Sequence, residues 1–261
     1  MPANGKQILK IPDSILHDPR YERQCWMPSI GNEGQKKLFS ASVLVIGAGG
    51  LGSPVLYYLA ASGVGRIGIA DHDIVSLSNL NRQILYNMND IGQLKTSSAK
   101  KKLNALNPLI SITEHQVYLD KQNISSIMAD YDFIVDATDN YPSRYLISDN
   151  CIREKKPLFF GAVSSWSGMF FSRIPSSNHA CFRCLYPVPL ESKLAEEEKQ
   201  KGIVGVTPGL IGTLIASQII QHICQGHHGF LGRFLWVDLE KGTMVSYAAN
   251  KNKNCRCNTL I

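Results

Sequence analysis

A run of four apolar residues that leads directly into a glycine-rich loop constrains the fold of this chain more than any other feature. Residues 43–46 read Val-Leu-Val-Ile, and residues 47–52 read Gly-Ala-Gly-Gly-Leu-Gly, which has the spacing G-x-G-x-x-G. A helix is expected over residues 54–62, directly after this loop. A buried strand, a tight glycine turn and a helix start together form the phosphate-binding turn of a Rossmann-type fold. The motif fits any nucleotide cofactor, and glycine turns also occur in structural loops, so it does not identify a ligand by itself.

The three glycines of the motif have separate roles in such a turn. Gly47 allows the chain to turn, Gly49 lets the backbone approach a phosphate, and Gly52 lets the helix pack closely on the strand. Residues 66–71 predict a second strand, which ends at Asp71. Asp71 lies 24 positions after Gly47 (71 minus 47), near where Rossmann folds place an acidic side chain on a ribose.

The rest of the chain divides into two parts with different patterns. Further helices are expected over residues 94–106, 124–128 and 144–155, and further strands over residues 110–119, 132–137 and 157–163. Strands that alternate with helices favour a doubly wound, mostly parallel sheet with right-handed crossovers. Beyond residue 163 the chain predicts a strand at 169–174, a charged loop at 191–202, a buried helix at 206–224 and a hairpin at 233–249 that turns at residues 240–243.

We therefore predict a single α/β domain over residues 1–261. Residues 1–30 would form an N-terminal arm, at residues 1–20, followed by a helix. Residues 31–163 would form a nucleotide-binding half, and residues 164–261 would form a second half that continues the same sheet.

Composition excludes several classes of protein. The chain has 261 residues, 44% of them hydrophobic, which suits a globular core. The net charge of +6 comes without an aromatic-interleaved basic patch, so we expect no nucleic-acid binding. No apolar run approaches the roughly 20 residues that span a bilayer, and residues 1–10 contain no apolar signal-peptide region. A cytoplasmic location without membrane association is the expectation.

Three charged residues beyond Asp71 suit a triphosphate better than a dinucleotide. Arg82 and Lys95 would neutralise phosphate oxygens, and Asp139, which follows the strand at 132–137, would hold Mg²⁺ through a carboxylate oxygen. In open α/β sheets the ligand lies beyond the carboxyl ends of the strands, where Asp139 is expected. Ordinary surface charge is the alternative for Arg82 and Lys95, and a helix N-cap is the alternative for Asp139.

Four of the seven cysteines form two close pairs, Cys181 with Cys184 and Cys255 with Cys257. In a reducing compartment, close pairs favour a metal over disulfides. Cys151 and Cys224 fall in expected helices and are interpreted as small apolar core residues.

Taken in order, these motifs resemble the ThiF/MoeB/HesA family, whose members are relatives of ubiquitin-activating enzymes. The resemblance covers roughly residues 18–257. It rests on Arg20-Tyr-Glu-Arg-Gln24, Gly47-Ala-Gly-Gly-Leu-Gly52, Asp71-His-Asp73, Ser78-Asn-Leu-Asn-Arg-Gln83, Lys95, Asp136-Ala-Thr-Asp-Asn140 and Cys181-Phe-Arg-Cys184.

The resemblance implies an adenylyltransferase. Members of this family use ATP and Mg²⁺ to adenylate the C-terminal glycine of a ubiquitin-like sulfur-carrier protein that ends in Gly-Gly, and they release pyrophosphate. The implied nucleotide-binding residues are Gly47, Gly49, Gly50, Asp71 (ribose), Ser78, Asn79, Leu80, Asn81, Arg82, Lys95, Asp139 and Asn140. The implied catalytic residues are Arg23, Arg82, Lys95 and Asp139, which also holds Mg²⁺. Arg23 corresponds to an arginine that reaches the γ-phosphate from the other subunit, which implies a homodimer.

The family also has a structural zinc held by two C-x-x-C knuckles, and here the chain departs from the pattern. Cys181 and Cys184 match the first knuckle, but Cys255-Arg256-Cys257 is C-x-C. Alternate residues of an extended chain point in opposite directions, so both sulfurs reach one Zn²⁺ only if Arg256 lies in a turn. The alternative is a set of degenerate cysteines without metal.

A second departure concerns covalent catalysis. Thiamin-type members carry a reactive cysteine in the loop that corresponds to residues 186–208, and this chain has none there. We therefore expect the reaction to stop at the acyl-adenylate, which an external sulfur donor or amine would take up. Cys25, which directly follows the motif at residues 20–24, is the one exception left open.

Three rival functions are left open by the sequence. One is activation of another peptide or small carboxylate, and a second is a nicotinamide-dependent oxidoreductase, against which Arg82 and Asp139 argue. A third is a non-catalytic partner subunit. The motifs do not distinguish thiamin from molybdopterin biosynthesis.

Overall fold

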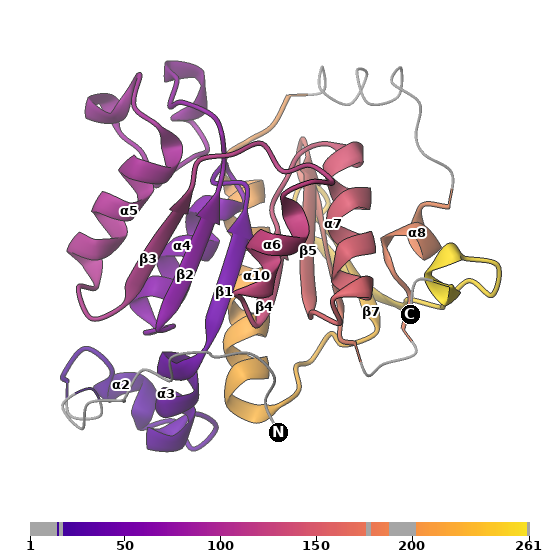
Figure 1. The fold of residues 1–261 in the computed structure, drawn as a ribbon, viewed down its shortest axis with the longest axis horizontal. Coiled ribbons are helices and arrows are strands. Elements are labelled where there is room, and N and C mark those ends of the chain that lie inside the picture. Colours follow the sequence, from indigo (N-terminus) through magenta and orange to yellow (C-terminus); the bar gives the residue numbers. More distant parts are fainter. Residues whose placement is uncertain (1–14, 16–17, 176–178, 188–201, 260–261) are drawn as a thin grey trace.

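An eight-stranded sheet forms the centre of the protein in the computed structural model, with the strand order β3-β2-β1-β4-β5-β6-β7-β8 (Figure 1). The structure describes residue 15 and residues 18–175, 179–187 and 202–259. Most of the expected arm at 1–20 and of the charged loop at 191–202 lies outside these ranges.

The first five strands run parallel, and the last three continue the sheet antiparallel. The parallel strands are β1 (Ser42–Ile46), β2 (Arg66–Ala70), β3 (Ser111–His115), β4 (Phe133–Asp136) and β5 (Leu158–Ser164). The antiparallel strands are β6 (Ser167–Arg173), β7 (Arg233–Asp238) and β8 (Thr243–Ala248). The predicted Rossmann-like sheet, continued by the C-terminal half, is confirmed.

Helices cover both faces of the sheet because successive residues of the buried strands point to opposite sides. Val43 and Val45 of β1 join one apolar cluster with the helices α3, α4, α5 and α10, whereas Leu44 and Ile46 join a second cluster with α6 and α7. Figure 1 shows α6 and α7 on the near side of the sheet. The long helices are α3 (Gly31–Ser40), α4 (Gly52–Ala61), α5 (Lys95–Leu106), α7 (Tyr141–Arg153) and α10 (Val206–Gln225). The short ones are α2 (Glu22–Cys25), α6 (Ile124–Ala129), α8 (Phe182–Leu185), η1 (Leu77–Asn79), η2 (Met88–Asp90) and η3 (Arg256–Asn258).

Three elements differ from the sequence prediction. Helix α3 was not predicted, because its buried apolar residues are few, Leu38 and Phe39, and glycines interrupt its pattern. Strand β3 ends at His115, and the buried Leu119 packs with the α6 and α7 cluster instead of extending the strand to residue 119. Helix α7 begins three residues earlier than expected because Asn140 caps it, with its side-chain oxygen accepting the Ser143 N–H at 2.9 Å. Within the described ranges, no helix combines the length and apolarity needed to cross a membrane.

Helix α10 packs directly on the start of α4, which follows the glycine loop. A methyl group added at Gly212 would lie 2.5 Å from the carbonyl oxygen of Leu51 and 2.5 Å from Cγ of Pro54. One turn earlier, a methyl group at Gly209 would meet nothing within 4 Å. The close approach at Gly212 therefore holds α10 against the beginning of α4.

We expect Gly212→Ala to destabilise the fold by about 1–3 kcal/mol, because the added carbon overlaps the backbone of a buried helix start. Gly209→Ala is the matched control on the same helix and should be neutral or stabilising by up to about 1 kcal/mol through helix propensity. Urea unfolding followed by circular dichroism measures both. Equal stability of the two variants would contradict the proposed contact.

Candidate nucleotide and metal sites

The loops that carry the predicted nucleotide residues meet at one edge of the sheet. Ile46 of β1 is in register with Ala70 of β2 and with Asp136 of β4, so the three strands end side by side. The strand order reverses between β1 and β4, which is the topological switch point where α/β sheets bind ligands. The glycine loop, Asp71 and residues 137–140 follow directly from these strands.

Two glycines of the loop are required by the backbone around them. Gly47 has φ of +93°, and a methyl group there would lie 2.7 Å from the carbonyl oxygen of Ala137. A methyl group at Gly52 would lie 2.0 Å from the carbonyl oxygen of Gly47. Gly47 therefore allows the turn, as predicted, whereas the closest contact at Gly52 is with the glycine loop itself and not, as predicted, with the strand.

The other two glycines of the loop face polar side chains. A methyl group at Gly49 would lie 3.5 Å from Nε2 of Gln83, and one at Gly50 would lie 3.5 Å from Cγ of Arg82 and 3.2 Å from Pro208 of α10. Gln83 is buried, and its Oε1 has no hydrogen-bond partner among the residues that the structure describes. An unsatisfied buried oxygen beside the loop fits a ligand that supplies a donor there.

Asp71 fastens the end of β2 to the glycine loop. Its Oδ2 accepts the backbone N–H of Ala48 at 2.8 Å, and its Oδ1 accepts the backbone N–H of Asp73 at 2.8 Å. The carboxylate is half-buried. A carboxylate has about four acceptor positions, so these two bonds leave capacity for ribose hydroxyls.

Lys95 is a buried cation at the start of α5. Its Nζ lies 2.8 Å from Oδ2 of Asp73, and its side chain is 6% exposed, against 52% for Asp73. Burial raises the pKa of Asp73, but the hydrogen bond and charge of Lys95 outweigh this and hold the pKa below its ordinary value. The hydroxyl of Tyr86 donates to the carbonyl oxygens of Ala48, at 2.9 Å, and Lys95, at 3.3 Å. Burial raises the pKa of Tyr86, so it stays a neutral donor.

The loop at residues 78–82 lies beside the glycine loop and beside the start of α10. Nη1 of Arg82 donates to the carbonyl oxygen of Ser78 and to Oδ1 of Asn81, each at 3.0 Å. The side chain of Asn79 accepts the Ser76 N–H at 3.2 Å, which closes the short helix η1. Leu80 is half-buried, and Ser78 and Asn81 are exposed.

The loop after β4 presents Asp139 to solvent. Asn140, not Asp139, caps α7, so the N-cap alternative for Asp139 is wrong. The loop is held from below by the buried Asp136, whose Oδ1 accepts the N–H of Thr138 at 3.0 Å and its hydroxyl at 2.7 Å. Nη2 of the buried Arg144 donates to the carbonyl oxygen of Thr138 at 3.0 Å. Burial raises the pKa of Asp136, and the positive charge of Arg144 opposes that rise.

Arg23 is the one predicted catalytic residue that the fold does not bring to this edge. It is exposed on α2 with its guanidinium 4.8 Å from the ring centre of Trp26. The neighbouring Gln24 donates to the carbonyl oxygen of Ser62 at 2.9 Å, just before β2 begins. Helix α2, which carries Arg23, therefore lies near the amino end of the sheet (Figure 1), and the length of β2, roughly 15 Å, separates that end from Asp71.

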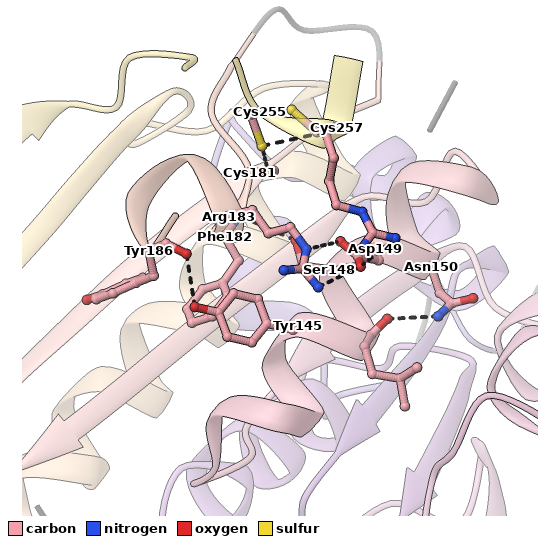
Figure 2. Close-up of polar contacts among 12 residues, drawn as sticks. Tyr145, Ser148, Asp149, Asn150, Cys181, Phe182, Arg183, Tyr186, Cys255 and Cys257 are labelled. Carbon is pink, nitrogen blue, oxygen red and sulfur yellow. Dashed lines mark hydrogen bonds and ion pairs between the residues drawn. The ribbon is translucent and has the colours of Figure 1, made fainter. Parts of the chain in front are cut away.

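Four cysteines meet between α8 and the C-terminal turn η3. Figure 2 labels three of them, Cys181, Cys255 and Cys257. Sulfur–sulfur distances are 3.7 Å for Cys181 to Cys184, 3.6 Å for Cys181 to Cys255 and 3.7 Å for Cys184 to Cys257. Four thiolates placed tetrahedrally about Zn²⁺, with bonds of about 2.3 Å, stand about 3.8 Å apart, so the set fits this ion. Burial raises the pKa of Cys181, and a cation would hold it as the thiolate at neutral pH.

The shortened second knuckle achieves this geometry through a turn. Arg256 begins the 3₁₀ turn η3, and Cys257 N–H points to Sγ of Cys255 at 3.5 Å. The condition that the C-x-C spacing imposed, a turn at Arg256, is confirmed. Both sulfurs therefore face the first knuckle.

The remaining cysteines are not arranged as nucleophiles. Cys151 and Cys224 are buried in the two apolar clusters, as predicted, and burial raises the pKa of both thiols. Cys25 packs against Tyr21 and Phe39, and burial also raises its pKa. A lowered pKa activates a thiol, and the shift at all three cysteines is in the opposite direction.

We call the edge where β1, β2 and β4 end the nucleotide edge. The sequence analysis did not predict four residues there: Asp73, Gln83, Tyr86 and Arg144. Asp73 and Gln83 lie inside motifs that the sequence displays, so their positions were visible while their contacts were not. Tyr86 and Arg144 carry no local signal, because their partners come from other loops.

The fold and these sites define a Rossmann-like α/β protein of the nucleotide-binding class, with a four-cysteine cluster whose geometry fits a metal ion. The chain belongs to the ThiF family, whose model matches residues 21–259. The resemblance found in the sequence is therefore confirmed. The "Sulfur carrier protein adenylyltransferase" of Thermus thermophilus is 39% identical over 90% of this chain and 89% of that protein. The "SAMP-activating enzyme E1" of Haloferax volcanii is 36% identical over 90% of this chain and 87% of that protein.

Other similar proteins are longer or more distant. The "Adenylyltransferase and sulfurtransferase MOCS3" of Arabidopsis thaliana is 46% identical over 80% of this chain, which spans only 44% of that protein. Among solved structures, E. coli MccB with ATP matches with a TM-score of 0.82 and 23% identity, over 95% of this chain and 77% of that one. That likeness shows the fold alone. The relatives' names favour an adenylyltransferase over the oxidoreductase and the non-catalytic subunit.

We expect the purified protein to contain one zinc ion per chain, measured by atomic emission spectrometry. Cys257→Ser should lose most of this metal and lower the melting temperature, because one of four thiolate ligands is removed. Cys25→Ser is the control and should retain the metal, because Cys25 lies in a separate apolar cluster. Full zinc occupancy in Cys257→Ser would contradict a site that includes the second knuckle.

Proposed function

We propose that this protein adenylates the C-terminal glycine of a small ubiquitin-like sulfur-carrier protein, using ATP and Mg²⁺ and releasing pyrophosphate. Family membership and the names of the similar proteins support the proposal. The observation that carries it is the set of charges at one edge of the sheet: Asp71, which follows β2 and binds the glycine loop, the buried Lys95 paired with Asp73, and Arg82 and Asp139 on neighbouring loops. Activation of another peptide or of a small carboxylate would use the same edge of the sheet. A requirement for a sulfur-carrier protein distinguishes the proposed function from these two alternatives.

The chemistry is in-line attack of the carrier carboxylate on the α-phosphorus of ATP. One oxygen–phosphorus bond forms, the bond to the pyrophosphate oxygen breaks, and the leaving group departs with the electron pair. A C-terminal carboxyl has a pKa near 3.5, so it is ionised at neutral pH and needs no general base. The task of the protein is therefore to position the reactants and to neutralise charge.

The residues of the edge suit these two tasks. Gly47, Gly49 and Gly50 bring backbone close to the phosphates, and Asp71 accepts the ribose hydroxyls. Lys95 and Arg82, with Asn79 and the rest of the loop at 78–81, bind the phosphates. Lys95 already lies in a buried position, so its charge acts in a medium that screens little.

Asp139, flanked by Asn140, would hold Mg²⁺ through a carboxylate oxygen at the exposed end of β4. A bound magnesium ion neutralises the oxygens of the departing pyrophosphate. Asp136 and Arg144 fix the backbone on either side of Thr138 and so set the direction in which the loop presents Asp139.

We also propose a homodimer with shared sites. Helix α2, which carries Arg23, lies at the opposite end of the sheet from the nucleotide-binding loops of its own chain. Arg23 could therefore contact the γ-phosphate only in the site of a second subunit.

The acyl-adenylate is proposed to pass to an external sulfur donor or amine. Residues 186–208 contain no cysteine, although residues 188–201 lie outside the described structure. Raised pKa values make Cys25, Cys151 and Cys224 poor nucleophiles. The pathway served, thiamin, molybdopterin or another, depends on the carrier. We propose that the reaction takes place in the cytoplasm, where the four thiols stay reduced.

Asp139→Ala should lower ATP–pyrophosphate exchange by roughly two orders of magnitude, because it removes the carboxylate ligand of the Mg²⁺ that would neutralise the leaving group. The exchange should require Mg²⁺ and a carrier that ends in Gly-Gly. Asp130→Ala, which removes an exposed aspartate at the end of α6, is the control and should retain activity. Wild-type exchange in Asp139→Ala, or exchange that needs no carrier, would overturn this assignment.

Mixing inactive Arg23→Ala and Asp139→Ala subunits should restore part of the exchange activity. If Arg23 acts in the partner's site, a mixed dimer contains one site with both residues intact. Native mass spectrometry of differently labelled subunits would verify that mixed dimers form. Absence of recovery in a preparation with verified mixed dimers would exclude a shared site.

A further inference from the structure

Three side chains of α7 reach the first cysteine knuckle from one face of the helix (Figure 2). Tyr145 donates its hydroxyl to the carbonyl oxygen of Tyr186 at 2.9 Å, and the oxygen of Ser148 accepts the Phe182 N–H at 3.3 Å. Positions i, i+3 and i+4 lie together on a helix, so Asp149 shares this face. The first knuckle is therefore held on α7 independently of any metal.

Asp149 makes the strongest of these contacts. Arg183, which lies between Cys181 and Cys184, donates Nε to Oδ1 at 2.8 Å and Nη2 to Oδ2 at 2.9 Å. The side chain of Asp149 is 9% exposed and that of Arg183 is 18% exposed. A two-pronged pair in a largely buried setting fixes the orientation of both groups.

The same carboxylate also contacts the second knuckle. Nη2 of Arg256 lies 3.9 Å from Oδ2 of Asp149. Arg256 is the single residue between Cys255 and Cys257, and its side chain is 55% exposed, so this contact is the weaker one. One carboxylate on α7 thus meets the arginine at the centre of each knuckle.

The charges make this arrangement useful to a metal site. Four thiolates around a divalent cation carry a net charge of −2, which nearby arginines offset. Asp149 keeps Arg183 and Arg256 beside the cluster. Through its 3.9 Å contact with Arg256, it also links the turn on which the C-x-C spacing depends to the helix that supports the C-x-x-C knuckle.

We propose that Asp149 is a positioning residue for the metal centre, which brings the shortened Cys255–Cys257 knuckle into line with the Cys181–Cys184 knuckle through Arg256 and Arg183. The inference rests on the binding of a metal ion by the four cysteines, whose geometry fits one. It does not depend on the adenylation reaction, so it can be tested without substrate.

The test is the rate at which the zinc-loaded protein transfers Zn²⁺ to a chromophoric chelator, far below the melting temperature. Asp149→Asn keeps the shape of the side chain and removes its charge. We expect it to release zinc about 10- to 100-fold faster than wild type, the usual cost of losing an outer-shell partner of a metal site. Arg256→Gln should give a smaller acceleration, and Arg256→Lys should restore part of the wild-type rate. Glu154→Gln removes an exposed carboxylate at the end of the same helix and should match wild type.

A second measurement separates positioning from general stability. Co²⁺ bound by the apoprotein absorbs according to the geometry of its thiolates, and we expect Asp149→Asn to shift this spectrum while Glu154→Gln does not. Wild-type zinc release together with a wild-type Co²⁺ spectrum in Asp149→Asn would overturn the proposal, even if the melting temperature fell. If Asp149→Asn does not fold, the pair Arg256→Gln and Arg256→Lys decides by the same two measurements. A wild-type protein that binds neither ion would reject the metal site itself and this inference with it, and it would leave adenylation unaffected.

Discussion

The contact between the Asp71 carboxylate and the backbone of the glycine loop is the interaction on which the nucleotide edge depends. Asp71 joins Ala48, on the loop after β1, to Asp73, on the segment after β2. Asp73 in turn pairs with Lys95. The position of the buried cation is therefore set by the same carboxylate that fixes the loop, and a shift of either strand end would move both. Burial removes the Lys95–Asp73 ion pair from part of its solvent, and such a pair is stable only when its geometry and additional hydrogen bonds offset the cost of desolvation.

A single helix, α7, connects the nucleotide edge with the metal site. Its first turn carries Asn140 as cap and Arg144 beneath the loop of Asp139, and later turns carry Ser148 and Asp149 against the knuckles. The helix has 13 residues, so it spans about 20 Å. A helix is a stiff element. The contacts of the four-cysteine cluster with the later turns of α7 therefore also help to hold its first turn, which supports the loop of Asp139. A metal ion held by the four cysteines would stabilise the fold at a distance from the reactants.

The fold was largely predictable because its signals are local and repeated. The apolar run before Gly47, the glycine spacing and the alternation of strands and helices each report on neighbours in the chain, and together they define a mostly parallel sheet. Prediction failed where burial was achieved with few apolar residues, as in α3, or where apolar residues left a strand to cover a helix, as at Leu119. The formation of α3 and the packing of Leu119 depend on which surface each segment contacts in the folded protein. The periodicity of apolar residues in the sequence does not contain that information.

The sequence by itself determined the class of the protein: the order of its strands and of most of its long helices, the glycine turn, the acidic and basic residues at the strand ends, and the four cysteines. Tertiary structure alone decided how these residues act on one another. Lys95 meets Asp73 across 22 positions, Arg183 meets Asp149 across 34, and Cys181 meets Cys255 across 74. The fold also places Arg23 away from its own nucleotide edge. The physical reason is that motifs record covalent spacing, whereas charge pairing and metal geometry depend on distances that only the packing of the sheet and helices fixes.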